Sequence, residues 1–220
     1  MNGKNGRTSE GLQGKTILLV NTGSIKKRFI LQQLKKLGLT VVVINKEKNW
    51  AQPYIDEWIL ADTNNFKESI QAVKEYFKNN SEKKIDGALT FWEDDVLLTA
   101  KITDTFNFIG IPFRIAQKAR NKFLFREFCE ENGIRAPQHT LLKSNDDCKM
   151  VSERFAFPLV VKPAYGASSA YVVKVENEEE LYSTYEYIRK NMSTEIESAL
   201  ANGSEILAEE YIDGDEVDVD

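Results

Sequence analysis

Short apolar runs alternate with helix-like segments along the first half of the chain, and this alternation is the strongest constraint on its fold. Thr16 to Val20, Val41 to Ile44 and Asp86 to Phe91 have the composition of buried strands. Apolar residues recur at helical spacing over Ile25 to Leu37 and again over Phe66 to Phe77. Parallel strands need crossover connections of about a dozen residues, so this order predicts an open, Rossmann-like α/β unit with a parallel sheet.

The chain divides into regions of different pattern. Residues 1–14 contain four glycines and one leucine, which predicts a flexible leader. The α/β unit is expected over residues 15–113, because the sequence NFIGIP at 107–112 interrupts a helix that begins at Val96. A second, α+β region is expected over residues 114–208, and a further segment covers residues 209–220.

The second region mixes strands and helices without the earlier regularity. Helices are predicted at Ala116 to Glu131, Asp146 to Phe155 and Glu178 to Leu200, and strands at Thr140 to Leu142, Leu159 to Lys162, Tyr171 to Val175 and Ile206 to Ile212. The final residues 215–220 alternate acidic and apolar side chains, which predicts the start of another strand.

Composition excludes several classes of protein. The hydrophobic fraction of 42% is enough for a core, and the net charge of −5 disfavours a nucleic-acid partner. His139 is the only histidine, and Cys129 and Cys148 lack metal-site spacing. His139 is expected at the surface, and Cys129 is expected to pack. No apolar run approaches the roughly 20 residues of a membrane span, so no membrane partner is expected. Two cysteines without CxxC spacing and the lack of an apolar signal segment favour a reducing cytoplasm.

The second region contains two lysines 40 residues apart and a loop of small residues after the second of them. Lys162 ends an apolar strand, and Lys122 precedes it by 40 residues. Residues 164–170, AYGASSA, connect two predicted strands and are too many for a tight hairpin turn. Lysine supplies a compact positive charge, and a glycine lets backbone N–H groups approach phosphate oxygens closely.

Four segments together resemble the ATP-grasp superfamily of ATP-dependent carboxylate ligases. They are Asn121-Lys122, the sequence FPLVVKP at 157–163, the loop GASS at 166–169, and the acidic sequence EEYIDGDE at 209–216. The resemblance covers roughly residues 15–220 and looks most like the branch that includes amino-acid ligases and carbamoyl-phosphate synthase. It implies a pre-ATP-grasp α/β domain, then the first ATP-grasp lobe, and an incomplete second lobe after the hinge at 209–220.

The resemblance also implies an ATP site, with the adenine at the hinge and the triphosphate at the lysines. Glu209 would face the adenine amino group, and Glu216 would accept hydrogen bonds from the ribose. The expected ATP-binding residues are Lys122, Lys162, Gly166, Ala167, Ser168, Ser169, Glu209, Glu210, Tyr211, Ile212 and Glu216. No catalytic residue is assigned.

The implied reaction activates a carboxylate with ATP as an acyl phosphate, which an amine then attacks. ATP and Mg²⁺ are the implied cofactors, and the metal ligands are expected after Asp220. The partners would be small carboxylate and amine substrates, and homo-oligomerisation is left open. Residues 1–220 alone are expected to be inactive, since metal charge neutralisation dominates phosphoryl transfer.

Two other functions fit parts of the sequence. The first is a non-catalytic nucleotide-binding module of the same fold. The second is a dinucleotide-binding oxidoreductase. The turn directly after the first strand has one glycine, Gly23, whereas the fingerprint GxGxxG needs three. The sequence WEDD at 92–95 could contact a substrate at the end of a strand, although a helix cap by Asp94 or Asp95 is the preferred interpretation.

Overall fold

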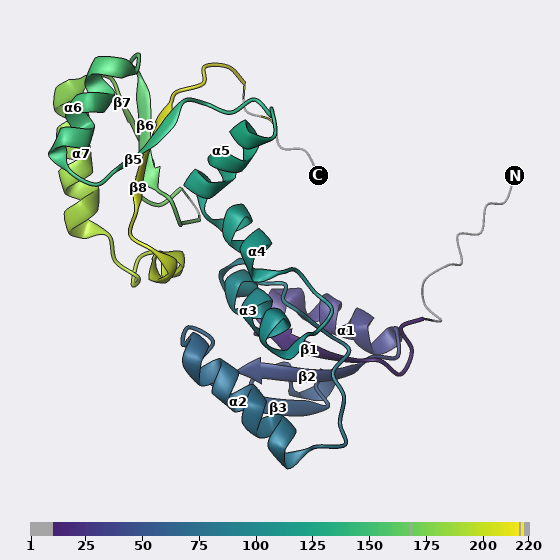
Figure 1. Cartoon of the computed structure of the whole chain (residues 1–220). Helices are drawn as coiled ribbons and strands as arrows, with labels where there is room; N and C mark the ends of the chain where they lie inside the picture. Colours follow the sequence, from purple (N-terminus) through teal and green to yellow (C-terminus); the bar gives the residue numbers. More distant parts are fainter. Residues whose placement is uncertain (1–10, 168, 216, 218–220) are drawn as a thin grey trace, which may run out of the picture. The chain divides into compact units, whose positions relative to one another are not determined.

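The computed structural model describes residues 11–167, 169–215 and 217, and it divides into two compact units, 1–116 and 117–220. Each unit is built around a separate four-stranded sheet (Figure 1). This confirms the expected fold class, a parallel α/β unit followed by an antiparallel α+β unit. No helix among the described residues has the length and apolar character to cross a bilayer.

The first unit has a fully parallel sheet in the order β3-β2-β1-β4. Its strands are β1 (Thr16–Val20), β2 (Thr40–Asn45), β3 (Glu57–Leu60) and β4 (Gly87–Leu89), and its helices are α1 (Arg28–Lys36), α2 (Phe66–Asn79) and α3 (Val96–Phe106). The side chains of Leu18 and Val42 pack on one face with α2 and α3. Those of Leu19 and Val43 pack on the other with α1, because successive strand residues point to opposite faces.

Three details of this unit bear on the sequence prediction. Strand β3 was not predicted, because only Ile59 is buried at this edge of the sheet and no apolar run marks it. The α-helix over the first amphipathic segment begins only at Arg28, after a 3₁₀ turn at Ile25–Lys27, and Phe29 is 65% exposed. Gly38 follows this helix with a φ of 72°, a left-handed conformation that is typical of a helix end.

The second unit has an antiparallel sheet in the order β5-β8-β6-β7. Its strands are β5 (His139–Leu142), β6 (Leu159–Pro163), β7 (Val173–Val175) and β8 (Ile206–Glu210), and its helices are α5 (Lys122–Glu131), α6 (Asn145–Arg154) and α7 (Glu178–Asn191), preceded by α4 (Phe113–Arg120) at the division between the units. Helices α6 and α7 cover one face of the sheet, on which Leu159, Val161 and Ala208 are buried. Helix α5 contacts β5.

Two predicted helices of the second unit are shorter than expected. The helix predicted over Ala116 to Glu131 is broken at Asn121, whose side chain accepts the Leu124 N–H and so starts α5 as a new helix. The helix predicted over Glu178 to Leu200 ends at Asn191, because Met192 leaves helical geometry and Glu197 turns inward. The predicted strand over 215–220 falls mostly outside the described residues, and Asp215 is not in a strand.

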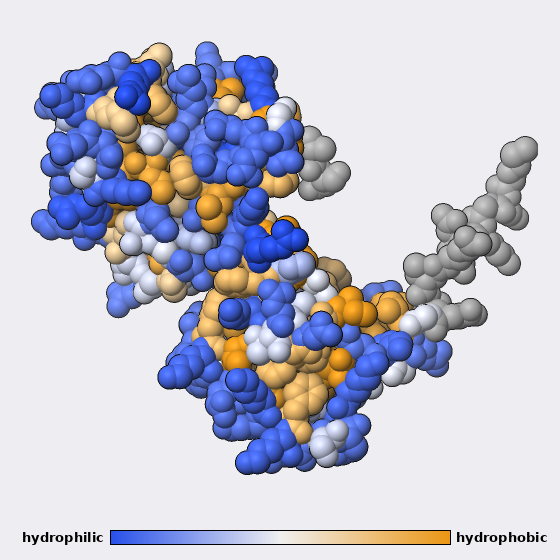
Figure 2. Space-filling model, viewed as in Figure 1, coloured by the Kyte–Doolittle hydropathy of each residue, from blue (hydrophilic) through white to orange (hydrophobic). Residues whose placement is uncertain are grey.

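Both units present largely hydrophilic side chains on the face shown in Figure 2, with apolar residues in separate patches. The two cysteines are free and buried, which confirms the expectation that Cys129 packs.

Candidate active site

Lys162 lies on the face of the second sheet opposite α6 and α7. Leu159 and Val161 point to the apolar core, so the strand alternation sends the Lys162 side chain to the other face, where it is 14% exposed. Its ammonium group forms a salt bridge with the Glu209 carboxylate on the neighbouring strand β8. A lysine at this position is therefore directed to a polar site and is not a solvated surface residue.

Glu209 is the buried centre of a three-residue charge cluster. Its side chain is 5% exposed, and its Oε1 accepts a hydrogen bond of 3.0 Å from Arg126 Nε on α5. Since Lys162 engages the other carboxylate oxygen, both oxygens have cationic partners. The expectation that Glu209 faces an adenine remains a prediction, and a nucleotide would have to share this carboxylate with Lys162 and Arg126.

Lys122 joins the start of α5 to the loop after β6. Its backbone N–H donates to the Ala164 carbonyl at 2.9 Å, and its Nζ donates to the Gly166 carbonyl at 3.0 Å. Burial lowers the pKa of Lys122 below its usual value, and the positive charges of Lys162 and Arg120 lower it further. An anion bound beside this ammonium group would relieve that electrostatic cost.

The loop itself is held by an acidic side chain. The Ala167 N–H donates to Glu197 Oε2 at 3.0 Å, while Glu197 Oε1 accepts the Ala199 N–H at 3.0 Å. Gly166 has a φ of 150°, a conformation that favours glycine. A phosphate that uses the Ala167 N–H would have to compete with the Glu197 carboxylate.

The two lysines and the loop at Gly166 line one pocket of about 330 Å³. Its described lining residues are Lys122, Lys162, Pro163, Gly166, Ala167, Ser169, Ala170 and Val172. Two ammonium groups and a glycine-containing loop suit the oxygens of a polyphosphate. No carboxylate is among these described lining residues, so they suit the phosphates and offer Mg²⁺ no carboxylate ligand.

The segment after β8 lines a second pocket, of about 620 Å³, with Arg135, Ala136, Pro137, Glu210, Tyr211, Ile212 and Asp213. The Glu210 and Tyr211 N–H groups donate to the carbonyls of Gln138 and Pro158. Lys174 Nζ lies 4.4 Å from the centre of the Tyr211 ring. Three of the expected ATP-binding residues, Glu210, Tyr211 and Ile212, thus share a pocket, whereas Ser168 and Glu216 lie outside the described residues.

Sequence reasoning missed two residues of the site. Arg126 follows Lys122 by four positions, so helical spacing alone places both on one face of α5. Glu197 carried no such signal, because it falls within a segment predicted to be a continuous polar helix.

The first unit has its own buried polar group, the Asp95 carboxyl. A helix cap was predicted for Asp94 or Asp95, and the structure excludes it for Asp95, whose side chain makes no capping hydrogen bond and accepts one from Asn21 Nδ2 at 2.8 Å. Burial raises the pKa of Asp95 to about 6. Asn21 follows β1 directly, so this bond fixes the loop at the carboxyl end of the parallel sheet.

Comparison with known proteins supports the resemblance to ATP-grasp ligases. Residues 155–220 match the family described as "ATP-grasp domain". D-alanine--D-alanine ligase of Pseudomonas entomophila is 31% identical over 113 residues, which are 49% of this chain and 32% of that protein. Human carnosine synthase 1 is 23% identical over 95% of this chain and 27% of its own length.

Solved structures share the fold across both units. The L-amino acid ligase of Bacillus licheniformis has a TM-score of 0.69 and 24% identity, covering 92% of this chain and 45% of that protein. N5-carboxyaminoimidazole synthetase of Staphylococcus aureus has a TM-score of 0.64 and 20% identity, covering 91% and 47%. The resemblance to ATP-grasp carboxylate–amine ligases is therefore confirmed, and the chain spans a third to a half of the length of the D-alanine--D-alanine ligase and of these two structures.

Proposed function

We propose that this chain is the ATP-binding part of a ligase that activates a small carboxylate, such as an amino acid, as an acyl phosphate and joins it to an amine. The observation that carries the proposal is the convergence of Lys122 and Lys162, 40 residues apart, on one pocket with the Gly166 loop. The relatives named above include ligases of amino acids, which supports this substrate class.

In the proposed mechanism the residues of this chain bind and orient the nucleotide. Lys122 and Lys162 hold the phosphates, and residues 209–212 hold the adenine. Mg²⁺ supplies charge neutralisation on the transferred phosphoryl group when it is bound. Its ligands are proposed to lie outside the pocket described, after Asp220. We keep the pre-ATP-grasp domain at 15–113, the first lobe at 114–208 and the hinge at 209–220 as proposed domains.

Nucleotide binding to the 220-residue chain tests the site directly. Calorimetric titration with ATP should show weak binding, because the residues that would close the pocket are not included. Lys122→Met and Lys162→Ala should abolish it. Lys149→Ala is the matched control, since Lys149 is exposed on α6. Equal binding by all four proteins would remove the assignment.

Catalysis is tested with a polypeptide that continues beyond Asp220. It should hydrolyse ATP in a Mg²⁺-dependent manner only when a carboxylate and an amine are supplied, and Lys162→Ala should suppress this activity. Nucleotide binding without turnover would favour the non-catalytic module. If residues 1–220 alone hydrolyse ATP as fast as the longer polypeptide, the proposed location of the catalytic groups is wrong.

A further inference from the structure

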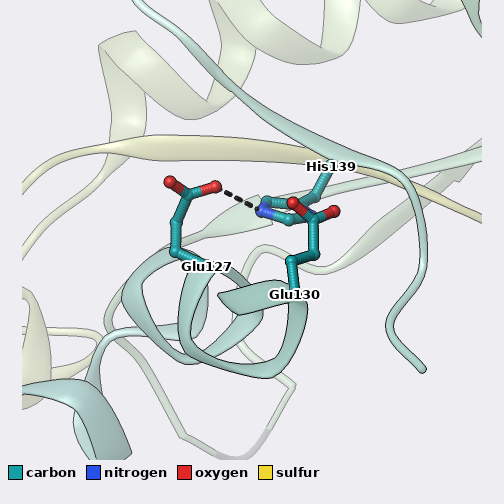
Figure 3. Close-up of side chains that lie close together, drawn as sticks. All are labelled: Glu127, Glu130 and His139. Atoms are coloured by element: carbon teal, nitrogen blue, oxygen red, sulfur yellow. Dashed lines mark hydrogen bonds and ion pairs between the residues drawn. The ribbon is translucent and has the colours of Figure 1, made fainter. Parts of the chain in front are cut away.

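A second cluster of ligand-type side chains lies on the other half of α5. Glu127 and Glu130 project from this helix toward His139, the first residue of β5 (Figure 3). One oxygen or nitrogen atom from each of the three side chains lies within 4.8 Å of the others. This cluster is separate from the lysine pocket, and its histidine is the only one in the chain.

The imidazole ring of His139 is fixed in orientation. Its side chain is 2% exposed, contrary to the expected surface position, and the Phe123 ring packs against it edge-on with centroids 5.5 Å apart. His139 Nδ1 lies 3.1 Å from the Pro137 carbonyl oxygen. A carbonyl oxygen only accepts hydrogen bonds, so Nδ1 carries a proton that it donates to Pro137.

The second ring nitrogen, Nε2, faces an acceptor of its own. Nε2 lies 3.0 Å from Glu127 Oε1, and Glu130 Oε1 lies 3.6 Å from Nδ1 of the same ring. A carboxylate oxygen also only accepts hydrogen bonds, so a cation must lie between it and Nε2, and this cation is either a proton on the ring or a metal ion that replaces it. A metal-binding histidine commonly has this arrangement, with its other ring N–H donated to a carbonyl or carboxylate.

We propose that Glu127, Glu130 and His139 bind a first-row divalent transition metal of the zinc class. One imidazole nitrogen and two carboxylate oxygens are typical ligands for Zn²⁺, whereas Mg²⁺ and Ca²⁺ favour oxygen ligands alone. Both glutamates are exposed, so their side chains are free to adjust to metal–ligand distances of about 2 Å. Water completes the coordination.

The metal ties α5 to β5, because it takes two ligands from the helix and one from the strand. Helix α5 also carries Lys122 and Arg126, so the same metal restrains the helix that presents these cations to the lysine pocket. The three ligands are not among the residues that line the lysine pocket, so metal binding can be measured without nucleotide and its test is independent of the proposed function.

Titration of the metal-free 220-residue chain with Zn²⁺, in excess Mg²⁺, should show one bound Zn²⁺ per chain and an increase in thermal stability. Glu127→Gln and Glu130→Gln should each weaken binding by about tenfold or more, since loss of even an outer-shell partner costs that much. Because both glutamates are exposed, these variants should fold normally. Glu131→Gln is the control on the same helix end, because Glu131 pairs with Lys118 outside the cluster.

The spectrum of the Co²⁺-substituted chain identifies the ligands. Nitrogen and oxygen ligation without a thiolate charge-transfer band is expected, because Cys129 and Cys148 are buried and are not part of the cluster. His139→Gln should abolish the spectrum. Absence of Zn²⁺ binding, a thiolate band, or binding that is unchanged in Glu127→Gln and Glu130→Gln would each overturn the proposal.

Discussion

Lys162 and Glu209 form a diagonal salt bridge between adjacent antiparallel strands, since Lys162 lies opposite Leu207 and Glu209 lies opposite Val160. The pair is nearly enclosed, with 14% and 5% of the two side chains exposed. Lys122, in contrast, has a pKa lowered first by burial and then by neighbouring positive charges. The two lysines share a pocket but differ in what their charges contribute to folding.

Lys162→Met should therefore destabilise the chain more than Lys122→Met. Removing Lys162 leaves the buried Glu209 charge with Arg126 as its remaining salt-bridge partner, and this should cost about 2 to 3 kcal/mol of unfolding free energy. Removing the Lys122 charge removes an ammonium group that burial disfavours. Urea unfolding of both variants measures the difference, and equal losses would contradict this account.

The loss of unfolding free energy caused by Lys162→Met should be smaller in a chain that already carries Glu209→Gln. Glu209→Gln removes the buried charge that Lys162→Met leaves behind, so the double variant should be more stable than the sum of the two single losses by about 1 to 2 kcal/mol. A double-mutant cycle in urea measures this coupling. Additive losses would mean that Lys162 and Glu209 do not interact in solution.

Gly166→Ala should weaken nucleotide binding with a small loss of stability. The φ of 150° strains any residue with a Cβ by about 1 kcal/mol or more, although among the described residues the new Cβ would meet only Glu197 Cγ at 3.9 Å and Lys122 Nζ at 4.0 Å. Relief of this strain should move the Gly166 carbonyl away from Lys122. ATP titration measures the effect on the pocket.

Gly133→Ala is the matched control for this backbone strain. Gly133 has a φ of 68°, and beyond its chain neighbours no atom of the part of the chain that the structure describes lies within 4 Å of the position that a Cβ would take. It follows α5 at the end remote from Lys122. This variant should lose stability but keep nucleotide affinity. Equal loss of affinity in both variants would mean that the loop at Gly166 has no special role.

Asp95→Asn should stabilise the chain at neutral pH. The pKa of Asp95 is raised from 3.8 to about 6 in the folded chain, so the native state binds more protons than the unfolded state between these values. Stability from this group is complete below about pH 4 and falls as the pH rises through about 6, by about 3 kcal/mol in total. Asparagine at position 95 can still accept from Asn21 Nδ2 and does not ionise.

The measurement is the unfolding free energy of both proteins from pH 4 to pH 7.5. The advantage of Asp95→Asn should grow as the pH rises. Asp86→Asn is a control with the opposite pH dependence. The hydrogen bond from the Thr16 N–H lowers the pKa of Asp86, so the Asp86 carboxylate stabilises the folded chain at neutral pH and this stabilisation is lost in acid. An advantage of Asp95→Asn that does not change with pH would contradict the raised pKa.

The sequence predicted those parts of the fold and site that depend on local pattern. Lys162 was found because it interrupts an apolar strand, and the strands β1 and β2 because they are continuous apolar runs buried on both faces. Strand β3 was missed because an edge strand with one buried residue leaves no such pattern.

The partners of these residues depend on the order of strands in the sheet. The contact of Glu209 with Lys162 requires β8 to lie beside β6, although β7 and α7 come between these two strands in the chain. Glu197 reaches Ala167 only because the chain leaves α7 at Asn191. Local propensity does not encode either placement.

Helix α5 contacts the candidate sites at three successive points along its length. Lys122 bonds to Gly166 at its start, Arg126 bonds to Glu209 in its middle, and Glu127, at the following position, contacts His139. A rigid helix cannot shift along its axis at one contact without shifting at the others. An anion at the Gly166 loop and a metal ion at His139 should therefore alter each other's binding free energy. By thermodynamic reciprocity the effect must be equal in both directions.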